Sequence, residues 1–246
     1  MIAEKMKDVL LNLVYPPRCP LCDKVLARPG FCDKCRKKIT CISGRLCMKC
    51  GKMVCDDREY CNDCEAIAHR FSTARSVYLY EGEMKDIMYR FKYSGRRDYA
   101  EVFADDAYRI CGSWLSFVKP DIVMPVPMFS KKKRKRGYNQ AEDIAYALTR
   151  KLASAGSRKD ILTDNKSLVR VKDTKALKTM DPSERRLTLS GAFQYRGSGV
   201  KSKKILLVDD IYTTGATIDA CADALLNAGA MDVSALTVCT GEDLRK

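Results

Sequence analysis

The stretch from Ile205 to Thr217 reads ILLVDDIYTTGAT and is the most specific pattern in the chain. Its continuous apolar start is typical of a strand buried on both faces of a parallel sheet. Asp209 and Asp210 follow at the carboxyl end of that strand, which is the edge where open α/β sheets bind their ligands. The pattern therefore predicts a ligand site at the edge of an α/β sheet.

The loop after the acid pair suits a phosphate group. A helix start offers free backbone N–H groups, and side-chain hydroxyls add donors, so we expect a pocket for a phosphate monoester. Five small or hydroxylated residues form this loop: Thr213, Thr214, Gly215, Ala216 and Thr217. The two carboxylates lie too close to that phosphate to bind it, and they suit ribose hydroxyls or a Mg²⁺ ion reached through water. The chain has no Walker A sequence and no complete G-x-G-x-x-G, which argues against P-loop and Rossmann proteins.

From residue 71 onward the sequence alternates between strand and helix patterns. Apolar runs predict strands over residues 77–80, 122–126, 167–171, 205–209 and 233–238. Helical spacing of apolar residues predicts helices over residues 84–91, 98–115, 139–152 and 217–228. This alternation predicts an α/β fold, a doubly wound parallel sheet with helices on both faces.

The N-terminal part differs from the rest in composition. Residues 2–14 place apolar side chains on one helical face and predict a short helix that ends before Pro16. Residues 18–64 hold few large apolar side chains, so core burial alone cannot stabilise them. We therefore expect two domains, a small Cys-rich domain over residues 1–70 and the α/β domain over residues 71–246.

The chain has 13 Cys, of which ten lie between Cys19 and Cys64, and eight of these form four C-x-x-C pairs. Two residues between cysteines let both thiolates reach one tetrahedral ion. Because short loops close at low entropic cost, we favour sequential pairing around two structural zinc ions over interleaved pairing. The first predicted set is Cys19, Cys22, Cys32 and Cys35, and the second is Cys47, Cys50, Cys61 and Cys64. Cys41 and Cys55 are interpreted as bystanders.

Two alternatives to zinc are an iron–sulfur cluster, which spacing leaves open, and a thioredoxin-type redox pair, whose βαβ context is absent. The N-terminus lacks the basic and apolar regions of a secretory signal, so we expect a cytoplasmic protein with metal-binding cysteines. No apolar run is long enough to predict a membrane span. The single His, His69, excludes most histidine-centred catalysis and is not interpreted as a ligand.

The formal net charge of +14 comes from 45 Lys and Arg against 31 Asp and Glu. Each Zn²⁺ with four thiolates carries −2, so two such sites would lower +14 to +10 and leave the protein basic. Six consecutive cations concentrate this charge in a predicted loop after the strand at 122–126: Lys131, Lys132, Lys133, Arg134, Lys135 and Arg136. These six positive charges are more than one pyrophosphate needs, so we expect nucleic acid as a second ligand. Tyr138 is predicted to stack on an unpaired base.

At the 205–217 stretch the chain resembles type I phosphoribosyltransferases, whose signature is an apolar strand, two acids and a T-T/S-G-x-T loop that holds phosphoribosyl pyrophosphate (PRPP). The segment RGYNQA at 136–141, the GAF strand at 191–193 and the double C-x-x-C pattern narrow the resemblance to the ComF family. That family joins a zinc-finger domain to a phosphoribosyltransferase domain and is implicated in natural competence, the uptake of DNA.

The resemblance implies roles for particular residues. Asp209 and Asp210 would be the catalytic acid pair that contacts the ribose hydroxyls with Mg²⁺, and residues 213–217 would bind the 5-phosphate. The strand end at 125–127 would lead into the pyrophosphate loop, and residues 170–185 would form a flexible loop that closes over the site.

Two functions are therefore weighed. The first is a PRPP-binding protein of DNA uptake and natural transformation that binds single-stranded DNA, with phosphoribosyltransferase activity as a further step. Its partners would include other competence proteins such as a DNA-uptake helicase. The alternative is a nucleobase-salvage phosphoribosyltransferase with an appended structural zinc domain.

Overall fold

The structure is a computed structural model that describes residues 15–55, 57–156, 160–174 and 182–242. The predicted helix over residues 2–14 lies outside the described residues, as do residues 175–181 of the predicted flexible loop.

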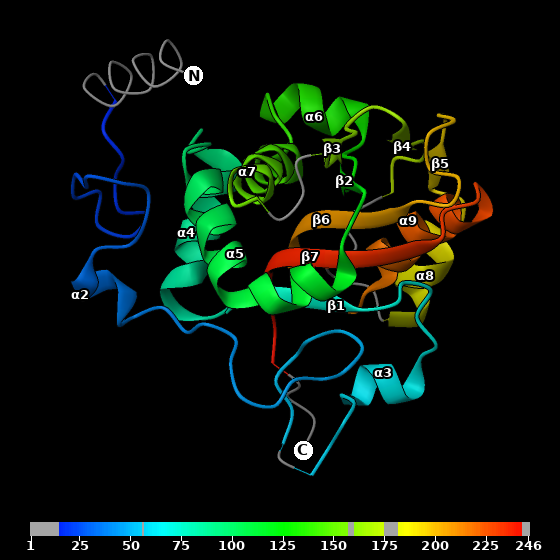
Figure 1. Cartoon of the computed structure of the whole chain (residues 1–246), viewed down its shortest axis with the longest axis horizontal. Coiled ribbons are helices and arrows are strands. Elements are labelled where there is room, and N and C mark those ends of the chain that lie inside the picture. The colour runs from blue at the N-terminus through cyan, green and yellow to red at the C-terminus, as the bar shows by residue number, and fades with distance from the viewer. Residues whose placement is uncertain (1–14, 56, 157–159, 175–181, 243–246) are drawn as a thin grey trace.

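A parallel sheet forms the centre of the molecule (Figure 1). Its strand order is β1-β7-β6-β2-β3, and every neighbouring pair runs parallel. The strands are β1 (Ala74–Leu79), β2 (Ile122–Pro125), β3 (Leu162–Thr163), β6 (Lys204–Tyr212) and β7 (Asp232–Thr240). Strand β6 lies between β7 and β2, so its apolar residues are buried on both faces, as the sequence predicts.

Helices cover both faces of this sheet, which confirms the predicted architecture. One face packs against α4 (Gly82–Tyr93), α5 (Tyr99–Val118) and α7 (Gln140–Ser154). The other packs against α9 (Ala216–Asn227), with α8 (Pro182–Leu189) beside it. Leu206 and Val208 of β6 belong to the first core, and Ile205 and Leu207 belong to the second, because successive strand residues point to opposite faces.

Strand β6 is longer than its apolar run predicts. It continues through the acid pair to Tyr212, because Asp209, Ile211 and Tyr212 pair with β7 at Thr237, Cys239 and Thr240. The acid pair therefore belongs to the strand itself, and the loop begins only at Thr213.

The segment predicted as a strand over residues 167–171 does not join the main sheet. It forms β4 (Leu168–Arg170), which pairs antiparallel with β5 (Phe193–Tyr195) in a separate two-stranded sheet. The place at the edge of the main sheet is taken by β3, which has two residues and no apolar pattern strong enough to predict it.

The basic run is also different from its prediction, because it forms a helix and not a loop. Helix α6 (Ser130–Arg136) begins after Phe129 and ends at Gly137, which adopts a left-handed conformation with φ of 88°. Lys133, Arg134, Lys135 and Arg136 lie in its last turn, where the partial negative charge of the helix end stabilises cations.

The Cys-rich segment carries α2 (Asp33–Arg36) and α3 (Asn62–Ala66). It bonds to the edge of β1, where the backbone N–H of Ile42 donates to the carbonyl of Val77 at 2.9 Å, and it packs against the α/β part at further places. The first place is at α4 and α5, where Arg96 binds Asp23 at 2.5 Å and Tyr99 donates to the carbonyl of Pro20 at 3.1 Å. The second is below the end of β6, where cysteines share an apolar cluster with Tyr212. In the part of the chain that the structure describes, no helix is long and apolar enough to cross a membrane.

Candidate functional site

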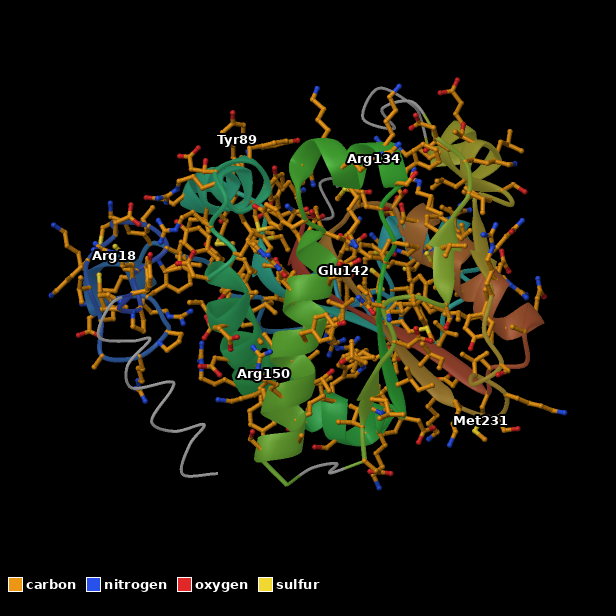
Figure 2. The ribbon with its side chains drawn as sticks, turned by 90° about the horizontal axis from the view of Figure 1, so that it is seen from above. Arg18, Tyr89, Arg134, Glu142, Arg150 and Met231 are labelled. Carbon is orange, nitrogen blue, oxygen red and sulfur yellow. The ribbon has the colours of Figure 1, made fainter. Side chains whose placement is uncertain are left out.

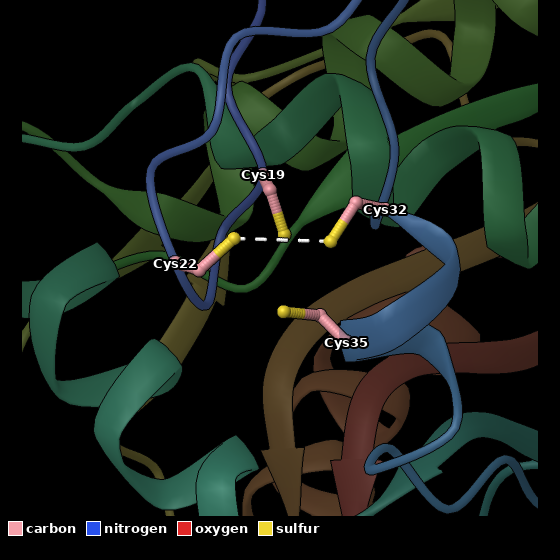
Figure 3. A group of neighbouring side chains, drawn as sticks. All are labelled: Cys19, Cys22, Cys32 and Cys35. Carbon is pink, nitrogen blue, oxygen red and sulfur yellow. Dashed lines mark hydrogen bonds between the residues drawn. The ribbon is translucent and has the colours of Figure 1, made fainter.

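The eight predicted cysteine ligands gather in two groups, which match the sequential sets and not the interleaved ones. The first group is Cys19, Cys22, Cys32 and Cys35, which Figure 3 shows with their sulfur atoms converging. The second is Cys47, Cys50, Cys61 and Cys64. Within each group all Sγ atoms lie within 4.8 Å of one another, and neither group includes Cys41 or Cys55.

Each group fits a tetrahedral zinc ion. A Zn–S bond of about 2.3 Å places two ligand sulfurs about 3.8 Å apart. The Cys22 and Cys32 Sγ atoms are 3.8 Å apart, and those of Cys50 and Cys61 are 3.5 Å apart. Four thiolates close the coordination sphere, so zinc would stabilise these loops and would leave no position for a substrate.

The second cysteine group is built into the base of the candidate ligand site. Cys47, Cys50 and Cys61 are completely buried in one cluster with Phe71 and Tyr212. Nearby, Lys52 binds Asp63 at 2.7 Å, and its Nζ lies 5.9 Å from the centre of the Tyr212 ring. The zinc-binding loops therefore contact the end of β6, directly before the predicted phosphate loop.

Asp209 and Asp210 lie at the predicted edge, but their surroundings differ. The Asp210 carboxylate binds Lys92 of α4 at 2.9 Å. Burial alone would lower the pKa of Lys92, but its attraction to Asp210 outweighs burial and raises that pKa. Burial, and then repulsion from Asp210, raise the pKa of Asp209 to about 7, which nearby Lys92 and Arg170 only partly offset. Asp210 is thus paired with Lys92, and the pKa of Asp209 lies near neutrality.

Residues 213–215 form a tight turn into α9, so Ala216 and Thr217 of the predicted loop are the first residues of that helix. Gly215 has φ of 80°, and a Cβ atom there would lie 2.6 Å from the Tyr212 Oη and 2.8 Å from the His69 Cε1. Only glycine fits this approach. The Tyr212 Oη and the Thr214 Oγ1 are buried and have no hydrogen-bond partner among the described residues, which marks them as donors available to a ligand or water.

His69 packs against this loop and contacts α9. Its Nδ1 lies 2.7 Å from the Asp219 Oδ2, and the backbone N–H of Arg70 donates to the Asp219 Oδ1 at 2.8 Å. Its ring stacks on Phe71 with centroids 4.7 Å apart. His69 is thus the structural link from the second cysteine group to α9, and it belongs to neither cysteine group.

Helix α6 places only part of its charge toward the acid pair. Lys133 binds Glu142 at 2.6 Å, so its charge is compensated within the protein. Other cations of α6 line a cavity of about 410 Å³, together with Tyr93 of α4 and Tyr138, which follows α6. Its walls include Lys92, Tyr93, Lys132, Lys135, Arg136 and Tyr138. Because Lys92 also binds Asp210, this basic cavity and the acid pair meet at one side chain.

Tyr138 does not stand free for the predicted stacking role. Only 8% of the residue is exposed, and its hydroxyl donates to the carbonyl of Phe91. The guanidinium carbon of Arg97 lies 5.4 Å from the centre of the Tyr138 ring, and Tyr138 forms part of the cavity wall.

Sequence reasoning gave no role to Lys92, His69 or Asp219, which lie in unrelated segments and are brought to the site by the fold. Arg170, within the predicted flexible loop, lies close enough to Asp209 to influence its charge. Lys92 could not be found from a motif, because α4 carries it among ordinary surface cations.

A family model of the phosphoribosyl transferase domain matches residues 119–246, and one of the double zinc ribbon domain matches residues 10–65. The fold and the site thus define a double zinc ribbon joined to a phosphoribosyltransferase domain. Competence protein ComFC of Bacillus subtilis (strain 168) is 31% identical over 217 residues, covering 84% of this chain and 82% of the relative. The chain belongs to the ComF family.

Two further relatives extend over most of the chain. Competence protein F of Haemophilus influenzae is 26% identical over 213 residues, with 85% of this chain and 89% of the relative covered. DNA utilization protein YhgH of Escherichia coli (strain K12) is 25% identical over 236 residues, covering 92% of this chain and 98% of the relative.

Proposed function

We propose that this protein acts in DNA uptake and natural transformation, binding PRPP at the end of β6 and single-stranded DNA through α6. The observation that carries the proposal is the meeting of an acid pair, a phosphate-type loop and a basic cavity at one sheet edge. The relatives named for competence and for DNA utilization support the biological setting.

PRPP carries a 5-phosphate, a ribose and a pyrophosphate, and the site offers a group for each. The 5-phosphate would take the N–H groups of residues 213–217 and the free hydroxyl of Thr214. Asp209 and Asp210 would accept hydrogen bonds from the ribose hydroxyls. Mg²⁺ bound with PRPP would neutralise the pyrophosphate, and Lys132 and Arg136 of the cavity would supply further positive charge.

The same site would support transfer of the phosphoribosyl group. In that reaction the bond from the ribose C1 to pyrophosphate breaks, and an acceptor nucleophile forms the new bond to C1. Negative charge from the acid pair would stabilise the cationic ribosyl group of the transition state, and the cavity cations would hold the departing pyrophosphate. Release of pyrophosphate from PRPP in the presence of DNA, nucleobase or amine acceptors tests this step.

Single-stranded DNA would bind through the phosphate contacts of α6. The test is fluorescence anisotropy of a labelled oligonucleotide at several salt concentrations, with all six cations of 131–136 changed to Ala. Each lost phosphate contact should reduce the slope of log affinity against log salt by about 0.7. Lys133→Ala is the matched control, because Glu142 already compensates Lys133, and it should change the slope less than Lys132→Ala. An absence of binding at low salt, or an unchanged slope in the six-cation variant, would exclude the DNA-binding role.

A further inference from the structure

Helix α4 exposes two tyrosines that its core packing does not need. Its buried face consists of Met84, Ile87, Met88 and Phe91. Tyr89 and Tyr93, one turn apart, are 62% and 58% exposed, and their ring centroids are 5.0 Å apart. The two rings are tilted by 48° to each other, and together they form an exposed aromatic surface on α4.

The tyrosine pair adjoins the cations of α6. The guanidinium carbon of Arg136 lies 4.9 Å from the centre of the Tyr93 ring, and its Nη2 is 3.4 Å from the Tyr93 Oη. Gln140 fixes the same guanidinium through its Oε1 at 2.7 Å from Nη1. Figure 2 shows Tyr89 of α4 and Arg134 of α6 along the same edge of the molecule. Aromatic surface and positive charge therefore alternate along one side.

Tyr93 also forms a wall of the basic cavity of about 410 Å³. That volume lies within the range of about 300–1,000 Å³ in which proteins hold small organic ligands. Among the residues that the structure describes, no carboxylate belongs to the cavity walls, although Lys92 of the wall is paired with Asp210. Burial, and then repulsion from Arg136 and Arg170, lower the pKa of Lys132. An anion in the cavity would relieve this repulsion.

We infer that Tyr89, Tyr93 and the basic cavity form a binding site for an unpaired nucleotide when the pyrophosphate of PRPP does not occupy the cavity, with the base stacked on the tyrosine rings and its phosphate held by Lys132, Lys135 and Arg136. This site rests on the proposed function, in which single-stranded DNA is the ligand, and it adds the residues that select an unpaired strand. A duplex keeps its base faces stacked on one another, so only an unpaired strand offers a face to the tyrosines.

This combination favours nucleic acid over an acidic protein segment. An acidic peptide would satisfy the cations but would leave the tyrosine surface unused. Bases carry a π face beside every phosphate, so one strand matches both features of the site. The site replaces Tyr138, whose ring is buried, as the source of base stacking.

The experiment measures anisotropy of a labelled oligothymidylate with the zinc-loaded full chain. Tyr89→Ala with Tyr93→Ala should weaken binding by about 5- to 150-fold for each stacked base lost. Tyr89→Phe with Tyr93→Phe keeps the rings and should stay within a few-fold of the wild type. Phe117→Ala is the control for loss of an exposed aromatic ring elsewhere, because Phe117 is 79% exposed on α5, and it should not change binding.

Two further readouts separate stacking from charge. The slope of log affinity against log salt should be the same in the wild type and the Ala variant, because no phosphate contact is removed. A duplex of the same length should bind with equal affinity to both. If the wild type binds the strand and the Ala variant binds it equally well, the inference is wrong while the proposed function stands. If the wild type does not bind the strand, the DNA-binding part of the proposed function itself fails.

Discussion

Gly215→Ala tests whether the phosphate loop is held as tightly as its packing against His69 and Tyr212 indicates. The left-handed conformation at φ of 80° destabilises an Ala by about 1–2 kcal/mol. Its Cβ would also meet the Tyr212 Oη at 2.6 Å and the His69 Cε1 at 2.8 Å, and such overpacking costs about 1–3 kcal/mol more.

Gly44→Ala is the matched control for this change. Gly44 has φ of 78°, nearly that of Gly215, but nothing lies within 4 Å of the Cβ position. It therefore carries only the conformational cost. At about 2–4 °C for each kcal/mol in a chain of this size, Gly44→Ala should lower the melting temperature by about 2–8 °C. Gly215→Ala should lower it by about 4–20 °C.

The assay is thermal unfolding followed by circular dichroism on the zinc-loaded chain, with PRPP affinity measured in parallel. The loop variant should also bind PRPP more weakly, and the Gly44 variant should bind it normally. In a Tyr212→Phe background, which removes the nearest contact, the cost of Gly215→Ala should fall. Equal melting temperatures for Gly215→Ala and Gly44→Ala would refute the close packing of this loop.

Three further predictions concern neighbouring groups. His69→Ala leaves the Asp219 carboxylate without one buried partner and should lower the free energy of unfolding by about 1–3 kcal/mol in urea titrations. His69→Asn keeps a donor and should recover part of the loss, so equal free energies for the two variants would contradict this role of His69. Cys50→Ser and Cys19→Ser should each release about one zinc per chain by metal analysis, but only Cys50→Ser should also weaken PRPP binding; an equal effect of both would show that the second site has no special link to the loop. The pKa of Asp209 is about 7 in the folded protein and lower in the unfolded chain, so the native state binds the extra proton and loses stability as pH rises from 5.5 to 7. Asp209→Asn should remove this decline in melting temperature, and parallel curves of melting temperature against pH for the two proteins would contradict the raised pKa.

Much of the fold follows from the sequence because its signals are local. The apolar run of β6 and the spacing of Met84, Ile87, Met88 and Phe91 in α4 each report burial directly. The cysteine sets are also predictable, because chain distance sets the cost of closing a loop. Strand β3, with only two residues, carries no such signal.

The remaining parts depend on contacts between distant segments. The side of α6 that faces the cavity is set by the Lys133 pair with Glu142, nine residues later, and by Arg136 against Tyr93 of another helix. Tyr138 shows the same limit, because a tyrosine next to six cations gives no sign that its hydroxyl reaches Phe91. Such long-range packing decides which members of a charged run are available to a ligand.

The end of β6 and the loop after it are proposed to form a PRPP site. The most direct measurement is calorimetric titration of the zinc-loaded chain with PRPP and Mg²⁺, repeated on Asp209→Asn with Asp210→Asn. We predict one PRPP bound per wild-type chain and no measurable binding to the double variant, which should keep the wild-type circular dichroism spectrum. No binding to the wild type, or equal affinity of both proteins, would contradict the assignment.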